Sequence, residues 1–172
     1  MILPISTYGS SVLRKKSESV KKITPELVEL AQNMLETMYK ANGVGLAAPQ
    51  IGKNIRLVVI DLAKDEEEHE PIILFNPEVE PEGGDNPLES GEEGCLSVPD
   101  IWANVSRPSR VRLTYTNEKG ETIDMQDVTG KLARCVQHEL DHLNGILFVD
   151  KISTADRAMN ASKLKRMAKE NK

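Results

Sequence analysis

Aromatic residues are scarce in this sequence, which holds two Phe, three Tyr and one Trp among 172 residues. A core must therefore be built mainly from Leu, Val, Ile, Ala and Met, and an apolar content of 39% is enough for a globular fold. A chain of this length favours one domain with one real core, so a single domain is predicted over residues 1–172.

Long apolar runs and export signals are also missing. No stretch approaches the about 18 apolar residues that a membrane span needs, and residues 1–5 do not place a basic segment before an apolar one. Two cysteines do not mark a disulfide-rich secreted scaffold. The net charge of -5 shows no basic excess, so neither DNA nor a membrane is expected as a partner. We therefore expect a cytoplasmic protein of the bacterial type.

Three helices are predicted from periodicity and from start signals. Thr24 can cap a helix over residues 25–38, where apolar residues recur at helical spacing. A second helix is predicted over residues 131–143, and its apolar stripe consists of Leu132, Val136, Leu140 and Leu143. A capping box at residues 153–156 predicts the start of a C-terminal helix.

The strand signals precede most of the helical ones along the chain. Buried strands are predicted over residues 55–62 and 72–75, and a hairpin over residues 111–115 and 123–125, where apolar and polar residues alternate. The charged segment 64–70 and the acidic, glycine-rich segment 81–94 are expected to be loops. Strands with few helices favour an α+β fold.

The strongest functional signal is the H-E-x-x-H motif formed by His138, Glu139 and His142. Histidines four residues apart share one helix face and can reach one metal ion, while the intervening Glu can accept a proton from water. The alternative is that two helical histidines simply pack, because the bare motif arises by chance in unrelated chains. The motif gains weight here because the sequence has only three histidines. The third, His69, lies in an acidic segment and is expected to be solvated.

A catalytic metal site needs a third protein ligand besides the two histidines, and an open position. An HExxH zinc peptidase is the alternative function, but the position of its third histidine is Phe148 here. Cys135 shares the histidine face, yet it lies about 10.5 Å from His142 along the helix, which strains closure on one ion. Cys95, beside the flexible Gly94, can approach from another segment, so it is the predicted ligand. The other alternative is a non-catalytic metal-binding module, in which Glu139 would have no function.

Two further segments bear on the site. Glycines within residues 43–50 would let a substrate backbone lie close, and Gln50 could supply an amide donor; a plain turn after the helix is the alternative. This segment does not match a phosphate-binding loop, because no Lys-Ser/Thr pair follows it. Glu93 is predicted to support the Cys95 segment by pairing with Arg107 or Arg110, against the alternative of a solvated loop acid.

Residues 43–50, 93–97 and 137–142 resemble, in order, the three signature segments of peptide deformylases. The resemblance implies an α+β fold, with antiparallel or mixed sheets around a central helix that carries the H-E-x-x-H motif, an N-terminal helix and a C-terminal helix. It also implies a metal-dependent hydrolase that removes the N-terminal formyl group from N-formylmethionyl nascent peptides and releases formate.

The resemblance implies a role for each matching residue of the metal site. The implied metal ligands are Cys95, His138 and His142, and Glu139 is the implied acid/base. Fe(II) is the implied native ion, and Zn, Ni or Co also suit this set of donors. Lys131 and Arg134 differ from the apolar residues that some relatives carry on this helix, so the edge of the substrate pocket is not implied by the resemblance.

The substrate-facing residues follow from the same resemblance and from the chemistry of the substrate. The Gln50 amide and the backbone N–H of Leu96 are the implied oxyanion donors. A methionine side chain needs an apolar pocket, and Val44 is expected to form one wall of it. The extended peptide is expected to pair with the backbone near Gly45 as an added strand.

Charge is unevenly distributed along the chain. Residues 150–172 hold seven basic and three acidic residues, a balance of +4, so the remainder carries -9. Such asymmetry can mark a docking segment. Because the substrate exists only while chains are being made, ribosomal RNA is the expected partner of this basic C-terminal helix. The alternative is a solvated helix with ordinary surface lysines.

Overall fold

A computed structural model describes residues 1–171, and its helices and antiparallel sheets form the expected α+β fold. The helices are α1 (Pro25–Lys40), α2 (Gly130–Leu143) and α3 (Thr154–Glu170). Both predicted caps are present: the Thr24 hydroxyl accepts from the Leu27 N–H at 3.3 Å, and the Ser153 hydroxyl accepts from the Asp156 N–H at 3.0 Å. Each hydroxyl gives an N–H of the first helical turn a side-chain acceptor, and the Leu27 N–H also donates to the Thr24 carbonyl at 3.1 Å.

The larger sheet has five antiparallel strands in the order β1-β2-β3-β6-β7. Their bounds are β1 (Gly45–Ala47), β2 (Leu57–Ile60), β3 (Ile72–Pro81), β6 (Val111–Thr116) and β7 (Thr122–Val128). The predicted hairpin is present as β6 and β7, in which Tyr115 lies opposite Ile123. Strand β1 pairs only with β2 among the described strands, so it forms one edge of this sheet.

Both faces of this sheet are covered, and β2 shows why its sequence is continuously apolar. Leu57 and Val59 belong to the core on the α1 side, whereas Val58 and Ile60 belong to the core that includes α2. Successive side chains of a strand point to opposite faces, so a strand between two helices must be apolar at every position. Burying each such side chain contributes about 1.5–3 kcal/mol before conformational entropy is subtracted.

A second sheet is the hairpin of β4 (Leu88–Cys95) and β5 (Val98–Pro108). The loop predicted over residues 81–94 is present only at residues 82–87, and the prediction is wrong for the rest, because β3 continues to Pro81 and β4 starts at Leu88. Strand β3 also runs past the predicted end of its short strand, with a register shift between Phe75 and Glu78. This irregularity accommodates Asn76, whose φ of 50° is left-handed.

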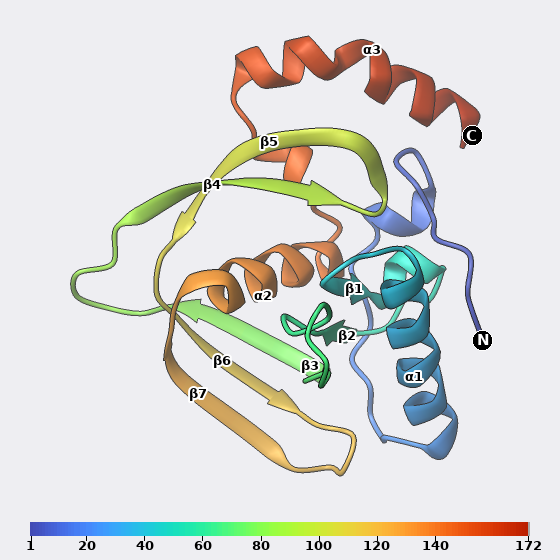
Figure 1. The fold of residues 1–172 in the computed structure, drawn as a ribbon, viewed down its shortest axis with the longest axis vertical. Coiled ribbons are helices and arrows are strands. Elements are labelled where there is room, and N and C mark those ends of the chain that lie inside the picture. Colours follow the sequence, from blue (N-terminus) through green and yellow to red (C-terminus); the bar gives the residue numbers. More distant parts are fainter. Residues whose placement is uncertain (172) are drawn as a thin grey trace.

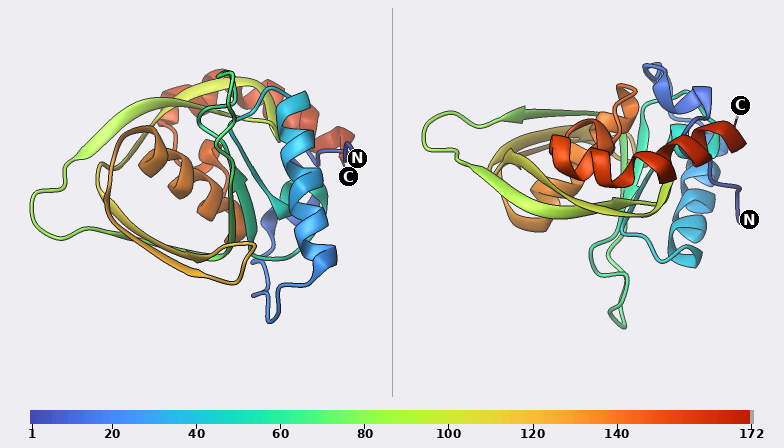
Figure 2. Two further views of the ribbon diagram at one scale, coloured as in Figure 1. Left: turned by 60° about the horizontal axis from the view of Figure 1, so that its bottom comes forward. Right: turned by 90° about the horizontal axis from the view of Figure 1, so that it is seen from above.

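Helix α2 lies between the five-stranded sheet and the β4–β5 hairpin, and α3 crosses the outer side of β5 (Figures 1 and 2). Apolar residues of the hairpin, the segment before α3 and α3 itself form a third core: Val98, Ile101, Ala103, Val105, Leu147, Phe148, Val149 and Leu164. Within residues 1–171, no helix combines the length and the apolarity that crossing a membrane requires. The two sheets thus enclose the helix that carries the H-E-x-x-H motif.

Candidate metal centre

Three side chains converge at the place where α2 meets the end of β4. One sulfur and two nitrogen atoms, from Cys95, His138 and His142, lie within 4.8 Å of one another. The two histidines come from successive turns of α2, and both are buried. Cys95 is the last residue of β4, and its Sγ lies 3.3 Å from His142 Nε2. Segments 43 residues apart in the sequence therefore supply one compact set of potential ligands.

A glycine precedes Cys95 at the point where the hairpin register shifts. The β4–β5 register shifts between Glu93 and Cys95, and the Trp102 ring lies directly against Gly94. A Cβ on Gly94 would come within 2.2 Å of the ring carbon Cζ3 of Trp102, so a larger residue there requires the ring or the strand to move. Two N–H groups face the sulfur: Ser97 N at 3.4 Å and Gln50 Nε2 at 3.5 Å.

Gln50 is held at the site by its own local turn. It lies in the 3-10 helix Ala48–Ile51 after β1, and its side chain is buried. Its Oε1 accepts from Ala47 N at 2.9 Å, which leaves the amide N–H groups pointing the other way. One of them donates to the Ser97 hydroxyl at 3.0 Å. The amide is therefore fixed with its donor side next to Cys95.

Glu139 is the buried carboxylate beside this cluster. Its Oε2 has no hydrogen-bond partner among the described residues, and its Oε1 lies so close to β1 that a Cβ on Gly45 would be 2.8 Å away. Burial raises the pKa of Glu139 to about 7. A carboxyl group with a pKa near neutrality can both accept a proton and return it.

Glu93 supports the cluster from behind, and its pairing with Arg107 is confirmed. Arg107 donates to both carboxylate oxygens, with Nε at 2.7 Å and Nη2 at 2.9 Å, while Arg110 pairs with Asp127 instead. Burial raises the pKa of Glu93, but the hydrogen bonds from Arg107 and His138 outweigh this and hold the pKa below its usual range. The solvated-acid alternative is therefore wrong.

The donor set fits a metal ion. Glu93 is ionised, so His138 Nδ1, 2.8 Å from Glu93 Oε1, donates its proton and leaves Nε2 free to bind. A thiolate sulfur and two imidazole nitrogens are the ligands that zinc and the neighbouring first-row metals take in proteins. The buried His142 Nδ1 and Glu139 Oε2 lack partners among residues 1–171, as polar atoms do where water or an ion completes the site.

The remaining candidate residues lie around this cluster at different depths. Leu96 follows Cys95 in the hairpin turn, and its side chain packs so close to Gly43 that a Cβ there would lie 2.8 Å from Leu96 Cδ1. Gly45 begins β1 beside Glu139, while Val44 is 40% exposed. Cys135 does not belong to the converging set; its sulfur faces Gly45, and burial raises the pKa of its thiol.

Other residues found near the site had no assigned role in the sequence. Ser97 holds the Gln50 amide, Asp141 accepts from Arg107 Nη1 at 2.9 Å, and Arg134 reaches Glu93. A signal for two of them was available, because Arg134 and Asp141 lie one turn from His138 on the same side of α2. His69 is exposed and lies outside the cluster, stacked on the Tyr39 ring.

Residues 2–158 match the polypeptide deformylase family. A peptide deformylase of Prochlorococcus marinus is 48% identical over 90% of this chain and 75% of its own length, and one of Mesorhizobium japonicum is 44% identical over 98% and 94%. The crystal structure of a peptide deformylase from Legionella pneumophila has a TM-score of 0.86 at 39% identity, covering 98% of this chain and 96% of that one. A Synechococcus elongatus peptide deformylase in complex with actinonin has a TM-score of 0.87 at 43% identity, over 94% and 87%. This chain therefore belongs to the polypeptide deformylase family.

Proposed function

We propose that Cys95, His138 and His142 hold one divalent metal ion at which the N-terminal formyl group of N-formylmethionyl peptides is hydrolysed to formate. Membership of the family makes the chain a hydrolase that removes this group from new polypeptides, and it decides against an HExxH zinc peptidase. The observation that carries the site is the convergence of three ligand atoms within 4.8 Å of one another. In this arrangement α2 is the central helix that carries the H-E-x-x-H motif.

The metal ion would supply Lewis acidity and lower the pKa of water at the site. Fe(II) is the proposed native ion, and the same donors suit Zn, Ni or Co. Glu139 is the proposed proton carrier: its Oε2, which lacks a hydrogen-bond partner among the described residues, takes the proton of the attacking water and returns it to the leaving amine. Because the formyl carbonyl carbon carries a hydrogen where the carbonyl carbon of an ordinary peptide bond carries Cα, a narrow site can admit it and exclude ordinary peptide bonds.

The substrate is proposed to lie along β1, which forms an edge of the larger sheet. Extended peptides bind such edges by adding a strand, with main-chain hydrogen bonds fixing the register. Gly45 would then place the substrate backbone next to Glu139, since its Cα already lies close to the Glu139 carboxylate. Val44 is proposed as an apolar wall for the methionine side chain, consistent with its exposed side chain.

Gln50 and the N–H of Leu96 are proposed as the donors to the oxyanion. A Gln50→Ala variant should lose about 10²–10³ in kcat with little change in KM, as expected for a donor used mainly in the transition state. Steady-state kinetics on formyl-Met-Ala-Ser measure both constants, with metal content checked because Gln50 also contacts Cys95. A variant whose only defect is a higher KM would show that Gln50 merely binds substrate.

The function is tested by one assay on protein purified without oxygen. Formate release from formyl-Met-Ala-Ser is expected, together with near-stoichiometric iron, and no cleavage of the unformylated peptide. Thiolate ligation leaves an iron site prone to oxidation, so air should inactivate this form and nickel or cobalt should protect it. Peptide cleavage without formate release would overturn the proposed reaction. A zinc form that is fully active and indifferent to air would overturn only the choice of iron.

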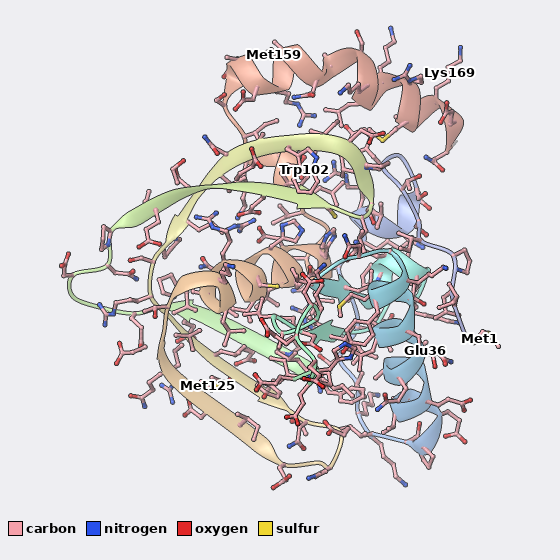
Figure 3. All side chains as sticks on the ribbon, viewed as in Figure 1. Met1, Glu36, Trp102, Met125, Met159 and Lys169 are labelled. Atoms are coloured by element: carbon pink, nitrogen blue, oxygen red, sulfur yellow. The ribbon has the colours of Figure 1, made fainter. Side chains whose placement is uncertain are left out.

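We further propose that α3 docks the enzyme on ribosomal RNA in the cytoplasm. Its side chains at Lys163, Lys165, Arg166 and Lys169 are exposed, and Leu164 is its only buried residue. Figure 3 shows Lys169 and Met159 on the side of α3 that faces away from the hairpin. Lys172, also counted among the basic residues of this segment, lies outside the described residues. A basic, solvent-facing helix surface suits the phosphate backbone of RNA.

Neutralising Lys165, Arg166 and Lys169 to Gln should weaken ribosome binding at low salt while turnover on a free formyl tripeptide stays nearly unchanged. Substitution is preferable to deletion, because Leu164 packs in a core and Asn171 donates to Thr7 and Tyr8. In a plot of log K against log salt concentration, the slope should become shallower by about 0.7–0.9 for each phosphate contact that is lost. Ribosome co-sedimentation measures both effects.

The control for this experiment changes the same charge elsewhere. Lys21 and Lys22 precede α1 and Lys40 ends it; all three are exposed and lie outside α3, so their triple change to Gln should leave ribosome binding intact. Equal binding by the α3 variant and the wild-type chain would remove the docking proposal without affecting the deformylase assignment.

A further inference from the structure

Arg134 occupies an unusual position for a long cationic side chain. It lies on α2 one turn before His138, and its side chain is only 22% exposed. Its Nη1 donates to Glu93 Oε2 at 2.6 Å and to the carbonyl of Val105 at 2.9 Å, and its Nη2 donates to the carbonyl of Glu89 at 2.8 Å. A single guanidinium thus binds both strands of the β4–β5 hairpin and one carboxylate between them.

Arg134 is one member of a polar face through which α2 meets the hairpin. The face consists of Arg134, Gln137, His138 and Asp141, at helical spacings of three and four. Gln137 donates to the carbonyl of Pro108, His138 donates to Glu93, and Asp141 accepts from Arg107. Polar contacts of fixed direction therefore set how the histidine-bearing helix sits against the strand that ends at Cys95.

The hairpin has a residue that makes room for this guanidinium. A Cβ on Gly91 would lie 2.9 Å from both Cζ and Nε of Arg134 and 3.0 Å from Nη2. A Cβ at that distance from planar guanidinium atoms forces one of the two groups to move. Gly91 and Arg134 therefore form a matched pair, and any side chain at position 91 competes with the guanidinium for the same space.

We propose that Arg134 is a positioning residue that locks Glu93 against His138 and ties the helix with both histidines to the hairpin with Cys95. The inference rests on the proposed metal centre. Glu93 Oε1 accepts from His138 Nδ1 at 2.8 Å, so any rotation of the carboxylate turns the imidazole. Arg107 pairs with the Glu93 carboxylate from β5, and Arg134 pairs with Glu93 Oε2 from α2 itself. With Arg134 in place, the carboxylate is fixed relative to the same helix that carries its imidazole partner.

The experiment uses cobalt-loaded protein, whose visible spectrum reports the arrangement of the ligands. Arg134→Met should release Co(II) to a chelator about 10-fold faster, at the lower end of what lost support of a metal ligand costs. Its ligand-field bands should shift while the far-ultraviolet circular dichroism stays that of a folded chain. Arg134→Lys should restore only part of the loss, because an ammonium lacks the fork that reaches several acceptors at once. Lys131→Met, an exposed position on the same helix, is the matched control.

A second variant displaces the guanidinium without removing it. Gly91→Ala should shift the cobalt spectrum and speed release much as Arg134→Met does, and the double variant should be no worse than either single one. Such non-additivity is expected if the glycine acts only through the arginine. A purely structural role would lower the melting temperature of the variants but leave the cobalt spectrum of the folded protein unchanged.

The outcomes separate this inference from the function on which it rests. If the wild-type chain binds cobalt with a thiolate charge-transfer band, the proposed centre holds. If Arg134→Met then shows the spectrum and release rate of the Lys131→Met control, the positioning role is overturned. Wild-type protein that binds no cobalt would instead overturn the metal centre itself.

Discussion

Replacing Glu139 with Ala is expected to leave the metal content unchanged while kcat falls by about 10²–10⁴, the usual contribution of a positioned acid/base. Glu139 follows His138 on α2, yet its carboxylate turns toward Gly45 and lies outside the converging set of ligand atoms. Its Oε2 is buried without a hydrogen-bond partner among the described residues. Removing it should therefore cost the proton transfer but none of the metal-binding atoms.

The measurement pairs kinetics on a formyl tripeptide with metal analysis of the same preparation. Glu139→Gln keeps the shape of the side chain but cannot carry the proton, so it should be nearly as inactive as Glu139→Ala. Glu92→Ala, which removes an exposed carboxylate of β4, serves as the matched control and should be close to wild type. Near-normal turnover by a metal-loaded Glu139→Ala enzyme would be incompatible with the proposed role.

The helices could be predicted because their signals are local. Caps at Thr24 and Ser153 and the apolar stripe of α2 depend on residues within a few positions of one another, and each is present. Strand β4 could not be predicted, because most of its side chains are exposed and its sequence is polar and rich in glycine. Pairing with β5, and not its own composition, makes it a strand.

Strand β5 was overlooked although its sequence did carry a signal. Ile101, Ala103 and Val105 alternate with exposed residues, which is the period of a half-buried strand, and Arg107 continues the buried face. A buried arginine at that position looks like a break in the apolar pattern until its partner is known. The structure supplies the partner, since Glu93 on β4 lies across the hairpin and pairs with it.

The candidate site shows the same division between local and distant information. The helical spacing of His138 and His142 is enough to predict that they share a face, and they do. The position of Cys95 relative to them depends on how the hairpin packs on α2, which no local pattern specifies. The contacts of Arg134 are harder still to predict from the sequence. They depend on the β4–β5 hairpin, which was not predicted, and on Gly91, which leaves room for the guanidinium.

The two cysteines are expected to respond in opposite ways to replacement by serine. Cys95→Ser should abolish tight metal binding. The loss of metal affinity should be larger than the about 10–100-fold loss that follows when only a contact supporting a ligand is removed. Cys135→Ser should retain one metal ion per chain. The reason is geometric: the Cys95 sulfur lies 3.3 Å from His142 Nε2, whereas the Cys135 sulfur faces Gly45 and does not join the converging atoms.

The surroundings of the two sulfurs lead to the same assignment. Burial raises the pKa of the Cys135 thiol, so this sulfur stays protonated, and a metal ion binds the thiolate. Cys95 instead receives two N–H groups at its sulfur, from the Gln50 amide and the Ser97 backbone. Cobalt-loaded protein distinguishes the two directly, because its thiolate charge-transfer band should vanish in Cys95→Ser and persist in Cys135→Ser. A band that persisted in the first variant and vanished in the second would reverse the assignment of the sulfur ligand, and with it the reach argument that excluded Cys135.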